Sequence, residues 1–374
     1  MEKVERNGGD FVLILNIALL VGVGLAILFS ASYYHAERIG KDAFYFFREQ
    51  IIFLAVGLVC AFLIARTPLD WIRKAVPGIL LTAFISSLLP FLPGIGKPIF
   101  NAHRWFFIFG FSFQPSEFVR IALVLYLAHI FSKKADKIND PVRYILPPLI
   151  IVLLFTALIY IQNDYSTAFF IFFIALSIFF IAGVRLVYFF LFGAITLPLA
   201  VVLLFTRVYW VKKILVFLNL DNDPNGTGYQ VLQARNALIS GGLAGKGFGN
   251  GIKKLGGLPE AHSDFIFAVI GEEAGYIGVL FIIALFVVFA YRGYLICYKC
   301  TDKFRYFLAF GITSFIFMQA LLNIGVVTGI IPATGMTLPF FSKGGSSLIT
   351  TLVMCGLLFN ISKQEKEYGR ITGG

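Results

Sequence analysis

The sequence predicts an all-α polytopic membrane protein with about ten transmembrane helices and a large structured extracytoplasmic loop between helices 7 and 8. Of its 374 residues, 59% are hydrophobic and only 14% are charged, which leaves a soluble fold too little polar surface to cover its core. Apolar runs long enough to cross a bilayer recur along the whole chain. The one long polar interruption, residues 207–263, is the predicted loop.

We expect one transmembrane domain over residues 1–374. The predicted spans are 11–33, 47–65, 76–93, 116–131, 145–161, 166–183, 187–206, 264–290, 305–331 and 344–362. The first run ends near SAS (30–32), which resembles a signal-peptide cleavage site. Because the apolar region of a signal peptide has only about 7–15 residues, an uncleaved helix is favoured.

Lysine and arginine are concentrated in the loops that face the cytoplasm when the N-terminus lies inside. This bias sets the orientation of a membrane protein. An even number of spans then places both termini in the cytoplasm and the loop 207–263 outside, which predicts a multi-pass membrane protein. The net charge of +11 follows from the same bias and does not imply nucleic-acid binding.

The four cysteines predict neither an exported disulfide framework nor a zinc site. None of them lies in a predicted outer loop, where a disulfide would form. Cys297 and Cys300 form a C-x-x-C pair, but no two further ligands are evident nearby. A structural role is therefore favoured for them, and no metal ligand is assigned.

Loops as long as 207–263 are usually functional or disordered, and this one has structured segments. YWVKKILVFLNL (209–220) predicts an amphipathic helix on the membrane surface. DNDPNGTG (221–228) is dense in turn-forming residues. GYQVLQARNALISGG (228–242) predicts a second helix that is closed by its glycine pair.

The run GGLAGKGFGNGIKKLGG that follows has two interpretations. It can be a compact, turn-rich loop. Alternatively, its backbone N–H groups and Lys246, Lys253 and Lys254 can surround a phosphate or pyrophosphate. It lacks the G-x-x-x-x-G-K-[ST] pattern of nucleotide-binding loops, and no ATP is supplied outside the cell. The excess of basic residues in the loop fits an anionic substrate at the outer surface.

The other predicted outer segments add polar side chains to the same side. Arg104 lies in NAHRW, Glu117 begins a helix in FQPSE, Asp164 lies in QNDYSTA, and Lys343 lies in FFSKGGSSL. Glu117 can simply satisfy a helix dipole and Asp164 can cap a helix.

Three carboxylates occur in LPEAHSDFIFAVIGEEAGYIG (258–278). On a continuous helix, three glycines share a face with Asp264 and form a stripe that allows close packing. Glu272 and Glu273 point elsewhere and lie about 12–13 Å deeper. Buried carboxylates are costly unless they are paired or hydrated. We therefore expect Asp264 at the water boundary and the glutamates paired with polar groups of neighbouring helices, or lining a deeper cavity.

The motifs carry a family resemblance over essentially the whole chain. The most specific is N-x5-G-I-x-P-x-x-G-M-x3-FF-S-x-GG-SS (323–347), joined by NAHRW, FQPSE, GYQ, GGLAGKGFGNG and LPEAHSDFIFAVIGEE. The chain resembles the SEDS family of shape, elongation, division and sporulation proteins, and its division-type members more than its elongation-type members. It departs from the family at Asn101, Tyr165 and Lys343, which weakens any role transferred to these three.

The resemblance implies a peptidoglycan glycosyltransferase of the bacterial cytoplasmic membrane that polymerises lipid II and releases undecaprenyl pyrophosphate. Asp264 matches the essential aspartate of the family and would act as the general base. The cations expected to offset charge on the leaving pyrophosphate are Arg104, Arg207, Lys246, Lys253, Lys254 and Lys343. Glu117 and Asp164 would shape or polarise the cavity. A class B penicillin-binding protein, a transpeptidase, is the implied partner, and a divalent cofactor cation stays undecided.

Three alternatives remain open from the sequence. A flippase that transports lipid II would use the deep charges Glu272, Glu273 and Arg120 more than Asp264. An elongation-type polymerase would share the chemistry and differ in its cellular role. A scaffold that only recruits other cell-wall proteins would tolerate changes at Asp264.

Overall fold

The computed structural model describes residues 9–96, 102–108, 111–134, 141–194, 216–217 and 226–372. Within these ranges the chain is mainly helical, and eight helices are long and apolar enough to cross a membrane. These are α1 (Phe11–Arg38), α2 (Tyr45–Arg66), α3 (Leu69–Leu88), α4 (Pro115–Lys134), α5 (Leu146–Ile161), α10 (Ile266–Lys299), α11 (Lys303–Val327) and α12 (Gly345–Thr372). A ninth apolar helix, α6 (Tyr165–Ile181), is shorter. The protein is therefore a polytopic membrane protein, as predicted.

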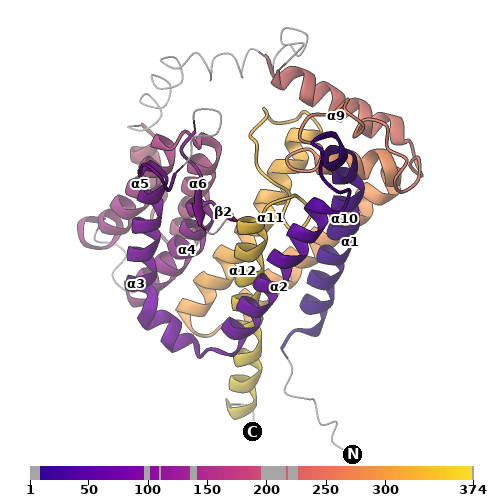
Figure 1. Cartoon of the computed structure of the whole chain (residues 1–374). Helices are drawn as coiled ribbons and strands as arrows, with labels where there is room; N and C mark the ends of the chain where they lie inside the picture. Colours follow the sequence, from indigo (N-terminus) through magenta and orange to yellow (C-terminus); the bar gives the residue numbers. More distant parts are fainter. Residues whose placement is uncertain are drawn as a thin grey trace, which may run out of the picture.

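The helices form two groups joined by a central pair (Figure 1). Helices α3 to α6 make one group, and α1, α2, α10 and the non-spanning helix α9 (Thr227–Gly241) make the other. Helices α11 and α12 lie between the groups, where α4 packs on α11 and α2 packs on α12. The start of α1 and the end of α12 lie at one end of the molecule, and α9 lies at the opposite end.

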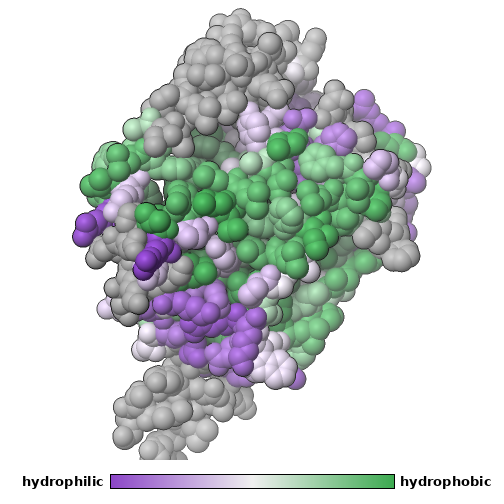
Figure 2. Space-filling model, turned by 90° about the vertical axis from the view of Figure 1, so that its left-hand side faces the viewer, coloured by the Kyte–Doolittle hydropathy of each residue, from purple (hydrophilic) through white to green (hydrophobic). Residues whose placement is uncertain are grey.

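Helices α4, α11 and α12 are the most buried of the spanning helices. In α4, α11 and α12, between 67% and 72% of the most apolar 18-residue stretch of the helix is buried, whereas in α2 only 11% of that stretch is buried. Figure 2 shows a broad hydrophobic band across the face formed by the first group, with hydrophilic side chains gathered below it. Such a band is what lipid tails would cover.

Local sequence sets where two spans begin. The Asp10 carboxylate accepts a hydrogen bond from the Leu13 N–H at 3.0 Å, and the Asp302 carboxylate accepts one from the Arg305 N–H at 3.0 Å. Both are N-caps, which satisfy N–H groups that lack a partner within the helix.

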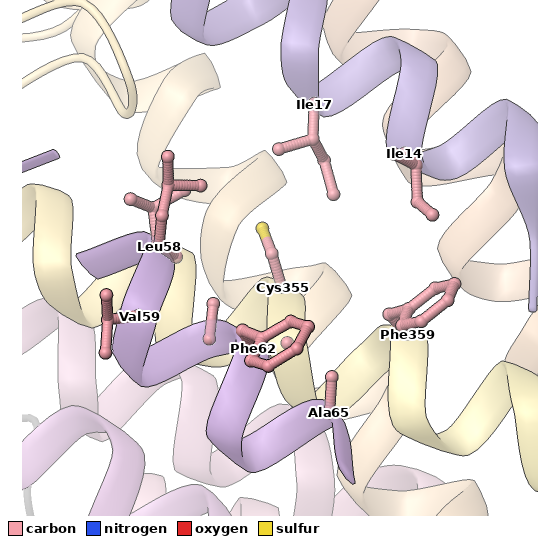
Figure 3. Close-up of a pocket in the computed structure, with 11 residues that line it drawn as sticks. Ile14, Ile17, Leu58, Val59, Phe62, Ala65, Cys355 and Phe359 are labelled. Carbon is pink, nitrogen blue, oxygen red and sulfur yellow. The ribbon is translucent and has the colours of Figure 1, made fainter. Parts of the chain in front are cut away.

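A groove of 510 Å³ opens between α1, α2 and α12 (Figure 3). Its lining is apolar and includes Ile14, Phe62, Cys355 and Phe359. It lies among the spanning segments and contributes no charged group to the site described below.

The predictions for the loop 207–263 are tested only in part. Residues 186–194 are helical, but the rest of the span predicted at 187–206 lies outside the described residues. So do Arg207 and most of the helix predicted at 209–220. The helix predicted at 228–242 is confirmed as α9, and the residue that caps its C-terminus, Gly242, has a positive φ of 56°.

Two local predictions were wrong. A short antiparallel hairpin, β1 (Phe106–Ile108) with β2 (Phe111–Phe113), occurs in a chain predicted to be all-α. Its aromatic residues favour strands, and the Phe106 and Phe113 rings pack 5.1 Å apart. The second error concerns α10, which is not one continuous helix, because Gly275 has φ 64° and ψ −164°.

At this break the glycine-rich loop takes the place of a helical turn. Four backbone groups of α10 that would bond within the helix bond to the loop instead. The Glu272 and Glu273 carbonyls accept from the N–H groups of Lys246 and Gly247 at 3.0 Å, and the Tyr276 and Ile277 N–H groups donate to the Gly242 and Leu243 carbonyls at 2.9 and 3.2 Å. A Cβ on Gly245 would lie 2.1 Å from the Glu273 carbonyl oxygen, so only glycine fits there.

The break divides α10 into two parts with different surroundings. Residues 276–299 alone extend about 36 Å, enough to cross a hydrocarbon core of about 30 Å. The part before Gly275 packs against α9 and the glycine-rich loop. Glu272 and Glu273 thus belong to the α9 end of the molecule, not to a position deep in the bilayer.

Candidate active site

Asp264 lies in the turn that precedes α10 and is half-buried. The Ser263 hydroxyl donates to its Oδ1 at 3.1 Å. Asn323 of α11 uses its side-chain amide to fix the backbone here, donating to the Asp264 carbonyl at 2.8 Å and to the Met336 carbonyl at 2.7 Å. Asp264 is therefore held between α11 and the segment after it.

The segment 328–344, which joins α11 to α12, holds the turn before α10 from the other side. The Ser342 hydroxyl donates to the Ser263 carbonyl at 2.6 Å, and the Lys343 N–H donates to the His262 carbonyl at 2.9 Å. This segment carries the most specific part of the family resemblance. Its observed role is to fix the main chain of the two residues that precede Asp264.

Arg104 and Asp164, predicted as separate site residues, form one cluster. Arg104 lies 3.7 Å from the Asp164 carboxylate and also donates to the Asn163 carbonyl. Asp164 occupies the N-cap position of α6 but makes no capping bond. Its carboxylate instead accepts from the Gln114 amide at 2.9 Å. The helix-cap explanation of Asp164 is therefore not supported.

Glu117 and Arg120 form a second, fully buried pair in α4. Arg120 lies 2.8 Å from the Glu117 carboxylate and donates to the Gln319 side chain of α11 at 3.3 Å. The Gln319 amide donates onward to the Thr337 carbonyl at 2.9 Å. The pair is thus connected to the segment 328–344 that flanks Asp264.

The Arg104 cluster is joined to the same region of the chain. The Gln114 N–H donates to the hydroxyl of Ser346, at the start of α12, at 3.2 Å. Gln114, Gln319, Asn323 and Ser342 are the connecting residues that the sequence reasoning missed. Gln114, Asn323 and Ser342 lie within the family motifs, and the only signal from Gln319 was a polar residue inside an apolar run.

Two predicted anion-binding lysines are paired with carboxylates. Lys246 lies 2.6 Å from Glu272, and Lys254 lies 2.5 Å from Glu273. Lys253 donates through its ammonium to the Gln233 side chain at 2.8 Å. Because Lys254 is fully buried, its ammonium pairs with Glu273 and is not accessible to a substrate phosphate.

Backbone N–H groups of the glycine-rich loop bind the same two glutamates. Gly249 donates to Glu273 at 3.1 Å, and Ile252 and Lys253 donate to Glu272 at 3.0 and 3.1 Å. The loop does surround anionic groups, but these are the protein's own carboxylates. The geometry favours the compact-loop interpretation over pyrophosphate binding by this loop.

Ser30 of α1 completes this network. Its hydroxyl lies 2.7 Å from Glu273 Oε1 and accepts from Lys254 at 2.7 Å. The glycine-rich loop, α10 and the distant helix α1 therefore meet at one buried ion pair. The SAS sequence that resembled a cleavage site supplies a structural residue within an unbroken helix.

Lys343 lies next to a stack of rings. Its ammonium is 3.9 Å from the centroid of the Phe46 ring and 3.6 Å from Glu49. The His262 ring stacks on His35 at 4.6 Å and on Phe46 at 5.2 Å. Burial, then the nearby His35 and Lys343, lowers the pKa of His262 to about 3.

The lowered pKa of His262 predicts that stability falls in acid. The native protein keeps this ring neutral, whereas the unfolded chain binds a proton below its usual pKa of about 6.5. Stability conferred by His262 is thus present above about pH 6.5 and falls by about 1.4 kcal/mol per pH unit below it, down to about pH 3. Thermal unfolding midpoints in detergent from neutral to acid pH measure this. His262→Gln should flatten the decline, and an unchanged slope would contradict the prediction.

The structure assigns no residues to a metal ion. In the part of the chain that it describes, no three His, Cys, Asp or Glu side chains come together as a metal-binding group. Cys297 and Cys300 are free thiols that donate to the Tyr306 and Ile296 carbonyls, which supports their structural role.

Comparisons with known proteins show which family the chain is similar to. A family model for FtsW, RodA and SpoVE, described as a cell cycle protein, matches residues 11–367. The chain is 39% identical to the probable peptidoglycan glycosyltransferase FtsW of Borreliella burgdorferi, over 96% of this chain and 98% of that protein. It is 36% identical to stage V sporulation protein E of Bacillus subtilis, over 97% and 99%.

Two solved structures share the fold along nearly the whole chain. One belongs to a peptidoglycan synthase complex that coordinates polymerization and crosslinking, with a TM-score of 0.79, 25% identity, and coverage of 96% of this chain and 98% of that one. The other is the rod shape determining protein RodA of Thermus thermophilus, with a TM-score of 0.69, 25% identity, and coverage of 96% and 97%.

Proposed function

The chain belongs to the FtsW/RodA/SpoVE family, and on this premise we propose that it polymerises lipid II into glycan strands with Asp264 as general base. Its activity is that of a peptidoglycan glycosyltransferase, as in the FtsW relatives, and these relatives indicate a role in cell division. The observation that carries the mechanism is the fixed position of Asp264. Asn323 donates to the Asp264 carbonyl. Ser342 and Lys343 donate to the carbonyls of the two preceding residues, Ser263 and His262.

In the proposed reaction, the Asp264 carboxylate takes the proton of an acceptor sugar hydroxyl as that oxygen attacks the anomeric carbon of the donor. The bond between this carbon and the pyrophosphate oxygen breaks, and undecaprenyl pyrophosphate leaves. The Ser263 hydroxyl at 3.1 Å from Oδ1 orients the carboxylate. Hydrogen bonds to the main chain of Asp264 and of the two residues before it limit its movement. A general base needs such a fixed geometry.

Arg104 is the cation we propose for the leaving pyrophosphate. Its side chain is 34% exposed, and its Nε is buried without a hydrogen-bond partner. Asp164 and the Asn163 carbonyl hold the guanidinium in place, and its remaining N–H donors can bind a ligand. Lys253, Lys343 and Arg207 stay as further candidates, and Glu117 acts through Arg120 on the segment beside Asp264.

The deep charges expected for a lipid II flippase are all occupied by protein partners. Glu272 pairs with Lys246, Glu273 with Lys254, and Arg120 with Glu117. A transport path needs charges that its cargo can reach. This pairing supports the polymerase over the flippase.

We further propose that the chain forms one domain, residues 1–374, with ten spans, both termini in the cytoplasm and the loop 207–263 outside. In this orientation Asp264 and α9 face the side where lipid II is consumed. The relative within a peptidoglycan synthase complex supports a crosslinking partner, which we propose to be a class B penicillin-binding protein.

Polymerisation and flipping can be measured on one preparation. The purified protein and its transpeptidase partner are placed in vesicles that carry labelled lipid II. Glycan strands, without faster movement of lipid II between leaflets, are expected. Flipping without polymer would refute the proposed function.

Arg104→Gln should weaken catalysis without unfolding the protein. A hydrogen bond to a charged group contributes about 1.5–3 kcal/mol, so kcat/KM for lipid II should fall about 10- to 100-fold. Arg48→Gln is the matched control, because Arg48 also pairs with an aspartate, Asp42, but is exposed. Equal activity of both variants would remove Arg104 from pyrophosphate binding.

A further inference from the structure

Four large apolar side chains are more than half exposed on the end of α9 and on the glycine-rich loop. They are Ile239 at 74%, Leu243 at 74%, Phe248 at 59% and Ile252 at 63% exposure. We call these four residues the apolar loop face. Exposed apolar side chains that are concentrated in one short stretch indicate a surface that is covered in the functional protein.

The apolar loop face continues the lipid-facing side of α10. The Ile277 N–H donates to the Leu243 carbonyl at 3.2 Å, so Leu243 lies beside the first turn after the break. From there α10 exposes Ile277 at 65% and, one turn further, Leu280 and Phe281. Because residues 276–299 are long enough to cross the bilayer by themselves, Leu243 lies at the level where the hydrocarbon ends.

The backbone of this loop can approach lipid at little cost. An unpaired N–H group in a lipid environment costs several kcal/mol. Here the N–H groups of Lys246 and Gly247 bond to carbonyls of α10, and those of Gly249, Ile252 and Lys253 bond to the two glutamates. The loop therefore presents side chains to its surroundings while these backbone donors are satisfied internally.

The charge of the segment indicates what covers it. Residues 226–258 contain neither Asp nor Glu. Of their four basic residues, Lys246 and Lys254 are paired with Glu272 and Glu273, which leaves Arg235 and Lys253 to attract anionic lipids. Apolar side chains combined with basic residues are typical of segments that lie at the boundary between headgroups and acyl chains, and the basic residues attract anionic lipids.

We propose that the apolar loop face is inserted into the headgroup–acyl boundary of the anionic leaflet at the α9 end of the molecule. The occupant of this surface is the bilayer. The glycine-rich loop thereby anchors the α9 end of the protein to the membrane. This inference does not depend on the catalytic assignment of Asp264.

Site-specific fluorescence in vesicles tests the proposal. In a full-length protein whose four native cysteines are replaced, single cysteines at Leu243, Phe248 and Ile252 carry an environment-sensitive dye. The vesicles contain equal parts of phosphatidylcholine and phosphatidylglycerol. Quenching is measured with a nitroxide on the lipid acyl chain and, separately, with aqueous iodide. Ile277→Cys gives the value for lipid, and Lys41→Cys, at an exposed position in the α1–α2 turn, gives the value for water.

The expected result is acyl-chain quenching at the three loop positions as strong as at Ile277, with iodide quenching weaker than at Lys41. Iodide quenching equal to that of Lys41, without quenching by the nitroxide lipid, would overturn the proposal. Shielding of the dye that arises only when the transpeptidase partner is added would also overturn it, because a protein would then cover the surface.

Discussion

Asp264→Asn is expected to abolish lipid II polymerisation, lowering the rate about 10²- to 10⁴-fold, the usual contribution of a general base. The amide has the size of the carboxylate and can still accept from the Ser263 hydroxyl, but it cannot take a proton from a sugar hydroxyl. The backbone bond from Asn323 is untouched, so the fold should persist. The rate is measured from glycan strands made in vesicles with the transpeptidase partner.

Asp42→Asn is the matched control for this experiment. Asp42 is a half-exposed carboxylate that pairs with Arg48, so its amide variant should polymerise at the wild-type rate. Asp264→Glu keeps a carboxylate but displaces it by about 1 Å, and misplacement on that scale costs about 100-fold. Full activity of Asp264→Asn, with unchanged elution in gel filtration, would exclude a general base at this position.

Lys254→Met is expected to destabilise the protein by about 3–5 kcal/mol, because it leaves a buried carboxylate without its counter-charge. Glu273 is only 2% exposed and would keep only neutral donors, the Ser30 hydroxyl and the Gly249 N–H. The thermal unfolding midpoint in detergent should fall clearly. Because α1, the loop and α10 meet here, polymerisation should fall with it.

The double variant Lys254→Met with Glu273→Gln separates charge from packing. It removes both charges while the glutamine oxygen still accepts from Gly249, and replacing a whole buried pair is often neutral. We expect it to recover most of the lost stability. Lys253→Met is the matched single change, since Lys253 bonds a neutral amide and should lose only about 1 kcal/mol. Equal losses at Lys253 and Lys254 would contradict the role of the buried pair.

Hydropathy and helix signals were sufficient to locate the spanning helices and α9. These elements depend on local composition, which the sequence displays directly. The break in α10 could not be predicted in this way, because apolar residues continue on both sides of Gly275. It depends on a loop that starts about 30 residues earlier in the chain. The helical-wheel argument that grouped Gly275 with Asp264 was therefore wrong.

The candidate site was predictable where a motif named the residue. Asp264, Arg104, Glu117 and Asp164 came from short polar motifs at the ends of apolar runs. The partner of each charge was not predictable, because Lys246 and Glu272, for example, are separated by an entire loop and a helix start. A glycine-rich run with lysines fits an external anion and an internal carboxylate equally well, and only the tertiary structure decides between them.

The exchange of backbone bonds at Gly275 also limits how this part of the chain can change in length. Surface loops usually accept insertions at small cost. Here the carbonyls of Gly242 and Leu243 and the N–H groups of Lys246 and Gly247 must face four fixed partners on α10. One residue inserted within 242–247 would shift these donors and acceptors away from their partners on α10. Natural variation in loop length should therefore accumulate on either side of residues 242–247, and an engineered tag would have to be placed there too.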